Sequence, residues 1–332
     1  MTDEPPDSRT GKLQDTRGHV RLARLAMRTR FEIVLAGGNN STALQAAGEE
    51  AMDEIERAES LLSAFQYGAD LHQINARAAR EAVRVSPLVI PFLHRCCALA
   101  EATDGACDIA VGALLDCWRI QHNGSNHEPD AQSIAEALAA CDVRRQLLID
   151  DHDLVRLAHP RARLDPGAVG KGWAIDRAIK LLRELGVPNG LVHGGTSTAY
   201  GFGNDPGRDG WTIAVQHPSD AQTIIATARL HNSSLSVSGL HGRTVNAGTR
   251  VIGHIIDPRS GQPVTDNLLA AAIHPSAMVS DALSTALMVL GKDGLSLLRS
   301  RFRDVSLLLA QTTDDDLGIT TVGDGFICKK LF

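Results

Sequence analysis

LDPGAVGKGWAIDRAIKLLRELGVPNGLVHGGTSTAYGFG, residues 164–203, carries the strongest local pattern in this chain. It predicts a glycine-rich loop, an amphipathic helix over 174–185, a turn, and a strand that enters a second glycine loop at Gly194-Gly195. The first loop gathers three glycines around Lys171 just ahead of the helix. Backbone N–H groups and an ammonium group therefore surround a helix N-terminus, where an anion is stabilised.

The spacing of these glycines matches neither of the best-understood phosphate motifs. Gly172 rather than Ser or Thr follows Lys171, which excludes GxxxxGK[ST], and the order GAVGKG differs from GxGxxG. A tight connection between a strand and a helix, in which the glycines adopt positive φ angles, explains the same pattern equally well. The loop alone leaves both an anion site and a purely structural turn open.

Length and composition indicate an ordinary globular protein. The chain has 332 residues, 43% of them hydrophobic, which is enough for one large domain or for two lobes. A formal net charge of −6 argues against a nucleic-acid or anionic-membrane surface. With two Tyr, three Trp and seven Phe, the chain also lacks an aromatic platform for single-stranded bases. We therefore expect no nucleic-acid partner.

The cysteines and the N-terminus indicate a reducing compartment. Six cysteines form no CxxC pair and no Cys/His spacing typical of zinc, and Cys96-Cys97 falls on an apolar helical pattern that favours buried free thiols over a vicinal disulfide. No run approaches the roughly 18 apolar residues of a membrane span. The first 25 residues are polar, without the apolar core of a signal peptide and without a lipobox. As written, the chain is expected in the cytoplasm, and export stays open if its start is misassigned.

The first half of the chain alternates helices with short strands. Residues 1–20 are predicted to be disordered, with ordered structure from near Met27. The patterns predict a strand over 30–35, a helix over 41–62 capped by Ser41, helices over 87–103 and 131–140, and a hairpin over 147–157. Asp108, between a glycine turn and an apolar run, is expected to cap a helix.

The second half changes to strands and then to a last strong helix. Short alternating runs at 211–215, 223–230, 235–238 and 249–256 predict an antiparallel meander. The helix is predicted over 275–290 and stops at Gly291.

Asp281 is the chemical anomaly of that helix. Residues 277–290 are apolar on nearly every face, so the helix should be buried, and a buried carboxylate needs compensation. Ser284 and Thr285 follow at i+3 and i+4, so three oxygen-bearing side chains project from one face and can converge. A hard cation such as Mg²⁺ takes a carboxylate and neutral oxygens, and it completes its shell with waters and substrate phosphates. A helix cap and a structural ion pair are the alternatives.

Together these pieces resemble the ApbE family, the flavin transferases that attach FMN from FAD to a threonine of a target protein. The motifs occur in the family's order between Met27 and Gly291. They are Met27–Thr29, the run through Leu71 and Asn75, Asp104–Asp108 with Val111-Gly112, Asp165–Gly172 with Asp176, Gly194-Gly195, Ser236–Gly239, His254–Gly261 and Ser280–Leu287. Each motif is weak alone, but the pair HIIDPRSG and SDALSTAL, about 26 residues apart, is highly specific.

The resemblance implies an α+β fold with mixed or antiparallel sheets, in which residues 21–332 form one domain of two intertwined lobes and FAD binds in the cleft between the lobes. It also implies roles for individual residues. The flavin-nucleotide contacts would be Met27, Phe65, Ala106, Cys107, Asp108, Asp165, Lys171 and Ile255. The ligands of Mg²⁺ would be Asp281, Thr285, an oxygen of Ser284 and the backbone carbonyl of Ala168. The glycine-lysine loop and the metal ligands would then both face the FAD pyrophosphate.

The implied reaction releases AMP from FAD. Mg²⁺ on the pyrophosphate neutralises developing charge, Asp281 holds the metal, and Lys171 binds a phosphate oxygen. A threonine hydroxyl of the acceptor attacks the phosphorus on the FMN side. His254 is the candidate general base, because a near-neutral imidazole can accept the proton. A lone histidine in a strand also fits a structural role.

Several positions depart from the family pattern without removing a metal ligand. They are Arg28, Phe65, Ala69, Cys107 and Arg119-Ile120, and they put flavin affinity in question rather than the pyrophosphate end. Three activities stay open: an FMN transferase, an FAD pyrophosphatase that yields FMN and AMP, and an FAD-binding protein without turnover. The sequence shows no recognisable acceptor domain, so a transferase would act on another protein. The sequence identifies neither that protein nor the oligomeric state.

Overall fold

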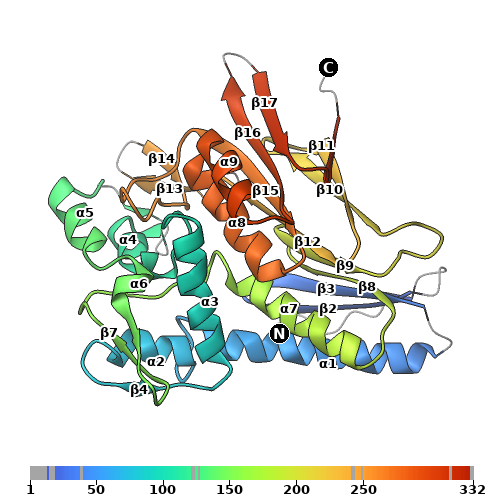
Figure 1. The fold of residues 1–332 in the computed structure, drawn as a ribbon, viewed down its shortest axis with the longest axis horizontal. Helices are drawn as coiled ribbons and strands as arrows, with labels where there is room; N and C mark the ends of the chain where they lie inside the picture. The colour runs from blue at the N-terminus through green and yellow to red at the C-terminus, as the bar shows by residue number, and fades with distance from the viewer. Residues whose placement is uncertain are drawn as a thin grey trace, which may run out of the picture.

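A nine-stranded antiparallel sheet forms the centre of the computed structural model, which describes residues 13–14, 19–37, 40–120, 124–125, 128–240, 244–247, 250–313 and 316–329 (Figure 1). In spatial order its strands are β1 (Leu13–Gln14), β2 (Val20–Ala26), β3 (Thr29–Ala36), β8 (Asn189–Gly194), β9 (Thr198–Phe202), β12 (Ser233–Gly239), β15 (Asn267–His274), β16 (Ser306–Thr313) and β17 (Asp316–Val322). The strands of this sheet pair antiparallel, and helices cover one of its faces. This arrangement confirms the predicted α+β class with antiparallel sheets.

The hairpin of β2 and β3 shows that ordered structure begins earlier than expected. Its turn is Met27-Arg28, with φ angles of 49° and 61°, and two consecutive positive φ angles match the twist of a hairpin. The expected start near Met27 is therefore too late, because Val20 already packs against the core under β3. Within the segment 1–20, the structure describes Leu13, Gln14, His19 and Val20 only, and Leu13–Gln14 pair with β2. The prediction of disorder for the rest of this segment lies outside the described residues.

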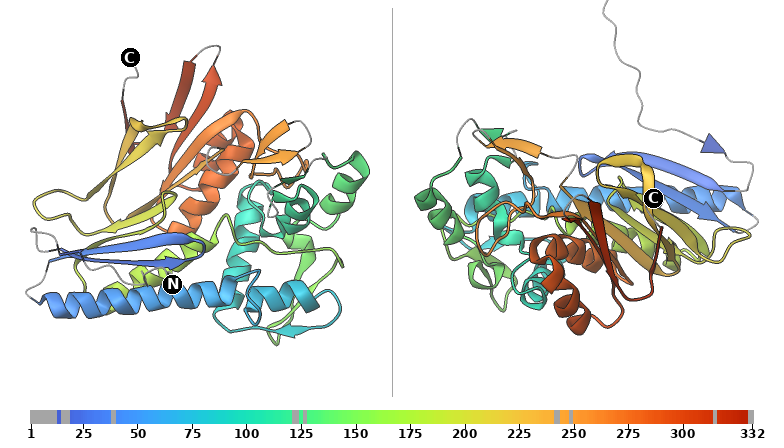
Figure 2. Two further views of the ribbon diagram at one scale, coloured as in Figure 1. Left: turned by 180° about the vertical axis from the view of Figure 1, so that it is seen from behind. Right: turned by 90° about the horizontal axis from the view of Figure 1, so that it is seen from above.

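Helices cover one face of the central sheet (Figure 2). They are α1 (Ser41–Leu62) and α7 (Gly170–Glu184) over β2, β3 and β8, α8 (Ala277–Leu290) over β12 and β15, and α9 (Lys292–Arg301) beside β16. The N-cap of α1 is Asn40 rather than Ser41, since its side chain accepts the N–H groups of Thr42 and Ala43. α7 starts at Gly170, so the glycine-lysine loop supplies the first turn of the helix that the sequence placed from residue 174.

Strands cover the opposite face, and their arrangement differs from the predicted meander. β10 (Trp211–His217), β11 (Asp220–Leu230) and β18 (Phe326–Cys328) form a separate antiparallel sheet that packs on the central one through Trp211 and Ile225. The strand at 235–238 instead belongs to the central sheet, and β14 (Arg250–Gly253) belongs to a third. The first two strands, β10 and β11, pair antiparallel as the meander predicts. The rest of the meander prediction is wrong, because alternation along a strand reveals a buried face but not a pairing partner.

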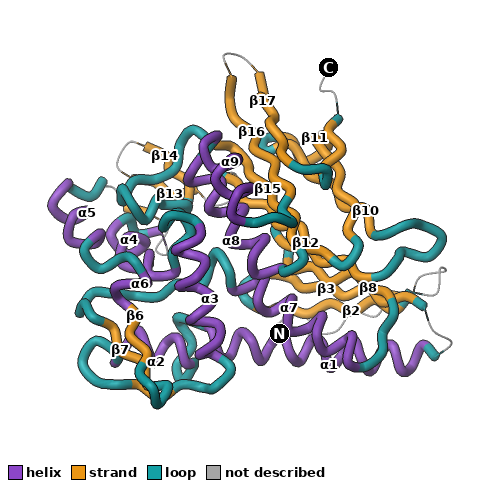
Figure 3. The backbone as a smooth tube through the Cα atoms, viewed as in Figure 1, coloured by secondary structure: helices purple, strands orange, loops and turns teal. Residues whose placement is uncertain are grey.

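The remaining elements form a smaller, mainly helical lobe beside the sheet (Figure 3). Its helices are α2 (Asp70–Arg77), α3 (Val89–Ala102), a 3₁₀ turn over Ile109–Val111, α4 (Gly112–Cys117), α5 (Ala131–Leu138) and α6 (Val143–Gln146). Its sheets are β4 (Val83–Arg84), β7 (Leu154–Leu157) and β6 (Leu147–Ile149), and β14 with β13 (Thr244–Ala247) and β5 (Gly124–Ser125). The predicted hairpin over 147–157 is confirmed by β6 and β7. Among the described helices, none combines the length and the apolar character that a membrane span needs.

Candidate functional site

The candidate site is built where α7 and α8 touch. A Cβ atom on Gly172 would lie 2.2 Å from the carbonyl oxygen of Ala277, so only glycine allows the two helices to approach this closely. The approach brings the Gly172 N–H to 3.1 Å from Asp281 Oδ2. Gly172 lies in a helix, without a positive φ angle. A structural turn with positive φ angles, one of the two alternatives for this loop, therefore does not explain Gly172. The close contact between α7 and α8 does explain it.

The two helices cap each other. Asp176 of α7 accepts hydrogen bonds at the start of α8 from the hydroxyl of Ser276 (2.7 Å) and from the N–H groups of Ala277 (2.7 Å) and Met278 (3.0 Å). Asp281 of α8 in turn accepts a backbone N–H from the first turn of α7. Each helix N-terminus thus receives a carboxylate for its unpaired N–H groups and its dipole. This reciprocal capping fixes α7 against α8.

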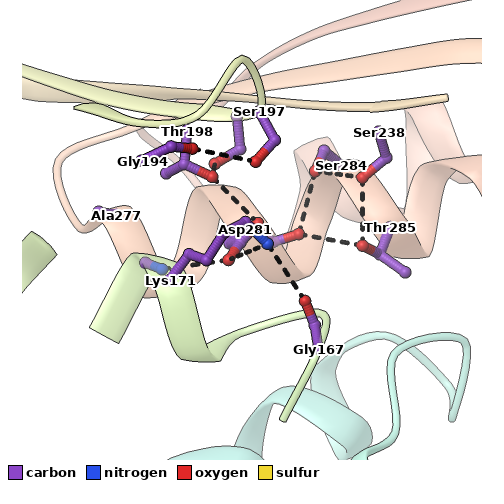
Figure 4. Close-up of polar contacts among 12 residues, drawn as sticks. Gly167, Lys171, Gly194, Ser197, Thr198, Ser238, Ala277, Asp281, Ser284 and Thr285 are labelled. Carbon is purple, nitrogen blue, oxygen red and sulfur yellow. Dashed lines mark hydrogen bonds and ion pairs between the residues drawn. The ribbon is translucent and has the colours of Figure 1, made fainter. Parts of the chain in front are cut away.

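Asp281 is only 4% exposed, and both of its carboxylate oxygens have partners (Figure 4). Oδ1 accepts a hydrogen bond from the Thr198 hydroxyl at 3.2 Å, while Lys171 Nζ lies 3.9 Å from Oδ2. Burial raises the pKa of Asp281, although Lys171, Gly172 and Thr198 each act to lower it. Desolvation of this carboxylate is therefore only partly compensated, and an additional cation beside it would be stabilised.

The hydroxyls of Ser284 and Thr285 converge on the main chain of Asp281 rather than on its carboxylate. They donate to the Asp281 carbonyl oxygen at 3.0 and 3.3 Å. Ser238 of β12 joins them, with its Oγ 2.9 Å from Ser284 Oγ and 3.2 Å from Thr285 Oγ1. Asp281, Ser284 and Thr285 therefore lie on one side of α8 as expected. They do not converge on one point, because the carboxylate forms one group and the hydroxyls form a second group beside it (Figure 4).

The loop before α7 is held from the smaller lobe by Asn75 of α2. The Asn75 amide donates to the carbonyl of Leu164 at 2.8 Å and accepts the Leu164 N–H at 2.7 Å. Further along the loop, Asp165 Oδ1 accepts the N–H of Gly167 at 2.8 Å, and Lys171 Nζ donates to the Gly167 carbonyl at 3.3 Å. The Lys171 ammonium group thus lies between the loop and Asp281. Ala168, which precedes α7, is in the same loop.

Asp108 caps two elements of the smaller lobe, which confirms the expected cap. Its Oδ1 accepts the N–H of Ala110 at 2.7 Å, and its Oδ2 accepts that of Val143 at 2.9 Å. Burial raises the pKa of Asp108 to about 6. The neighbouring Cys107 is 3% exposed, and burial together with the carboxylates of Asp108 and Asp281 raises the pKa of its thiol. The Cys107 thiol therefore lies within electrostatic range of Asp281.

A single carboxylate dominates the site. Among the described residues, no three His, Cys, Asp or Glu side chains form a cluster that could hold a metal ion. The oxygens near Asp281 are instead hydroxyls and carbonyls. Such a donor set suits a hard cation that takes its remaining ligands from water and a bound phosphate compound.

Comparison of the sequence with known protein families gives a match over most of the chain. The sequence profile of the ApbE family matches residues 27–309. The chain belongs to the ApbE family. That range contains Asp281, Lys171 and every other residue discussed above for the site.

Named relatives and solved structures of ApbE proteins agree with this assignment. The chain is 32% identical over 250 residues to a FAD:protein FMN transferase of Klebsiella pneumoniae (strain 342), covering 74% of this chain and 77% of the relative. It is 29% identical over 279 residues to a protein of the same name from Treponema pallidum (strain Nichols), covering 80% and 77%. Its fold is similar to the ApbE protein of Thermotoga maritima, with a TM-score of 0.79, 26% identity, and 88% of this chain and 94% of that one covered. It is also similar in fold to the apo form of the Pseudomonas stutzeri flavinyl transferase ApbE, with a TM-score of 0.80, 24% identity, and 95% and 96% covered.

The other flavin contacts that the ApbE resemblance implied come from several elements. Met27 is half-buried in the turn between β2 and β3, and Phe65 is 60% exposed between α1 and α2. His254 is half-buried directly after β14, and Ile255 is buried in the core beside it. Of these implied contacts, Lys171 lies beside Asp281, with its Nζ 3.9 Å from Oδ2.

Sequence reasoning on this ApbE chain missed four residues of the site: Thr198, Ser238, Asn75 as the anchor of the loop, and Gly172 as the helix contact. One signal was present, since serines alternate at 234, 236 and 238 along β12. A period of two places all three on one face of the strand, which is the face toward α8. Thr198 gave no such signal, because its partner Asp281 lies far away in the sequence.

Proposed function

We propose that this chain transfers FMN from FAD to a threonine hydroxyl of a separate protein and releases AMP. Its membership in the ApbE family supports this, as do its relatives named FAD:protein FMN transferase. The observation that carries the proposal is the placement of Lys171 beside Asp281 at the N-terminus of α7. An ammonium group, helix N–H groups and a partly compensated carboxylate together suit a nucleotide pyrophosphate and its cation.

The residues around Asp281 fit a Mg²⁺ ion that binds together with a nucleotide. Each carboxylate oxygen accepts one hydrogen bond, from Gly172 or Thr198, and keeps a lone pair for another partner. We place Thr285, Ser284 and the carbonyl of Ala168 beside it as neutral oxygens. When bound, Mg²⁺ would neutralise charge on the pyrophosphate and make AMP a better leaving group.

The other residues would position the nucleotide and move a proton. The Lys171 side chain is 23% exposed and reaches both Asp281 and the Gly167 carbonyl, so a phosphate oxygen at this point would gain a charge-assisted hydrogen bond. His254 would accept the proton of the threonine hydroxyl. The flavin nucleotide would contact the remaining residues that the family resemblance implies, which are Met27, Phe65, Ala106, Cys107, Asp108, Asp165 and Ile255.

The test is incubation of the purified protein with FAD and Mg²⁺, following AMP release with and without a threonine-containing acceptor domain that a related FAD:protein FMN transferase modifies. The proposal predicts AMP release together with flavin that stays on the acceptor after denaturation. AMP and free FMN in equal amounts, with or without the acceptor, would identify an FAD pyrophosphatase instead. Binding of FAD with no AMP release would identify an FAD-binding protein without turnover.

A further inference from the structure

Thr198 is a buried residue to which the proposed reaction gives no role. It begins β9 and is 2% exposed, and its hydroxyl faces the carboxylate of Asp281 (Figure 4). Asp281 Oδ1 is 3.2 Å away on one side, and Ser236 Oγ is 3.2 Å away on the other. The hydroxyl therefore links β12 to the carboxylate at the centre of the candidate site.

The direction of these hydrogen bonds follows from the number of protons. An ionised carboxylate has no proton to give, so the Thr198 hydroxyl donates to Asp281 and accepts from Ser236. The next hydroxyls along the β12–α8 contact continue the row. Ser236 Oγ also lies 3.1 Å from Ser280 Oγ, and the Ser280 proton faces Ser234 Oγ at 2.9 Å and the Ala277 carbonyl at 3.0 Å. Ser234 in turn donates to the Ala199 carbonyl at 2.9 Å. The proton of Thr198 is thus committed to Asp281, and Ser236 supports that orientation.

Two hydrogen bonds from different elements fix the plane of the Asp281 carboxylate. Oδ2 is held by the Gly172 N–H from α7, and Oδ1 by Thr198 from β9. A carboxylate held at one oxygen only can rotate about its Cβ–Cγ bond, which would allow Oδ1 or Oδ2 to turn toward the Lys171 ammonium group. Mg²⁺ demands near-ideal octahedral geometry and is therefore sensitive to such rotation. Mutation of a group that orients a metal ligand typically lowers metal affinity or activity by about 10- to 100-fold.

We propose that Thr198 is a positioning residue that orients the Asp281 carboxylate for a divalent cation. This inference rests on the proposed function, in which Asp281 holds the cation of the nucleotide. Thr198 acts through Asp281, whereas Ser234 in the same buried row serves the packing of β12 against α8. Loss of the Thr198 hydroxyl should weaken cation binding while nucleotide binding without the cation is retained.

The experiment compares three variants: Thr198→Val, which keeps the shape without the hydroxyl, Thr198→Ser, which keeps the hydroxyl, and Ser234→Ala, which removes a buried hydroxyl that bonds elsewhere. Melting temperature is measured against Mg²⁺ concentration at fixed ADP, which offers a pyrophosphate but no FMN to transfer. ADP binding without Mg²⁺ is measured by calorimetry. If Thr198→Val does not fold, Thr198→Ala replaces it.

For Thr198→Val, we expect the Mg²⁺ concentration at half-maximal stabilisation to rise by about 10- to 100-fold, with ADP affinity in the absence of Mg²⁺ within about 2-fold of wild type. Thr198→Ser should restore the Mg²⁺ response, and Ser234→Ala should leave it unchanged. A wild-type Mg²⁺ response in Thr198→Val, an equal loss in Ser234→Ala, or a wild-type protein that does not respond to Mg²⁺ would each overturn the inference. Failure of the proposed function is distinguishable, because it appears as absent FMN transfer by wild type while the Mg²⁺ titration still decides the role of Thr198.

Discussion

Asp281→Asn separates the metal role of this residue from its role as a helix cap. Asparagine keeps the volume, and its carbonyl oxygen can accept the Gly172 N–H that caps α7. Its NH₂ group can donate to Thr198 Oγ1, whose own proton then turns to Ser236. The substitution therefore preserves both hydrogen bonds and removes the negative charge that we propose for Mg²⁺.

The expected change in stability follows from two opposing contributions. At 3.9 Å and an effective dielectric constant of about 20, the attraction between Lys171 and Asp281 amounts to about 4 kcal/mol. Desolvation of the carboxylate costs at least as much as its partners return, since burial raises the pKa of Asp281 despite them. A pKa raised in the folded state means that the ionised group costs stability once the pH exceeds that pKa. At pH 7 without Mg²⁺, the free energy of unfolding of the variant should therefore equal or exceed that of wild type.

The assay is thermal melting of both proteins with and without Mg²⁺ and FAD, alongside AMP release. The variant should lose AMP release and the Mg²⁺-dependent rise in melting temperature while its fold survives. Asp281→Ala is the control that also removes the cap of α7, and it should be less stable than the asparagine variant by about 1–2 kcal/mol. An asparagine variant destabilised by about 3–5 kcal/mol, the cost of breaking a buried ion pair, that still releases AMP at the wild-type rate would refute the metal role.

FAD should bind more tightly than FMN in flavin-fluorescence titrations, because the departures from the family pattern concern the flavin ring whereas the Lys171–Asp281 pair is intact; equal or weaker FAD binding would count against the site. Lys171→Met should weaken FAD binding by about 1.5–3 kcal/mol, the range for hydrogen bonds to charged groups. A sharp fall in melting temperature with unchanged FAD affinity would instead make the lysine structural. Burial raises the pKa of Asp108 to about 6, so the stability that this group contributes below its unfolded pKa is lost as the pH rises through about 6. The difference in free energy of unfolding between Asp108→Asn and wild type, measured in urea titrations, should therefore shift in favour of the variant by up to about 3 kcal/mol from about pH 4 to pH 7.5. A difference that does not change with pH would contradict this.

Much of the local structure could be predicted because it depends on neighbouring residues. The apolar run of α8, the glycine stop after it and the hairpin of β6 and β7 follow from periodicity and turn residues alone. Sheet order could not be predicted this way, because β12 pairs with β9 and β15 through contacts that span long stretches of chain. The early start of β2 was missed for a related reason, since Val20 is ordered by packing on β3 rather than by its own polar surroundings.

The candidate site shows the same division. Asp281 could be singled out from the sequence because a lone carboxylate in an apolar helix needs an explanation. Its partners could not, because Thr198 and Gly172 reach it only after β9, α7 and α8 are assembled. The glycine loop was interpreted through backbone φ angles, whereas the space for Ala277 is what requires Gly172.

Covalent transfer of FMN is tested most directly by the mass of an acceptor domain after incubation with this protein, FAD and Mg²⁺. We predict a mass increase of one FMN group per acceptor, an equal amount of AMP, and no mass increase when the acceptor threonine is replaced by alanine. An unchanged acceptor mass, with FAD either intact or split into free FMN and AMP, would contradict the transferase activity.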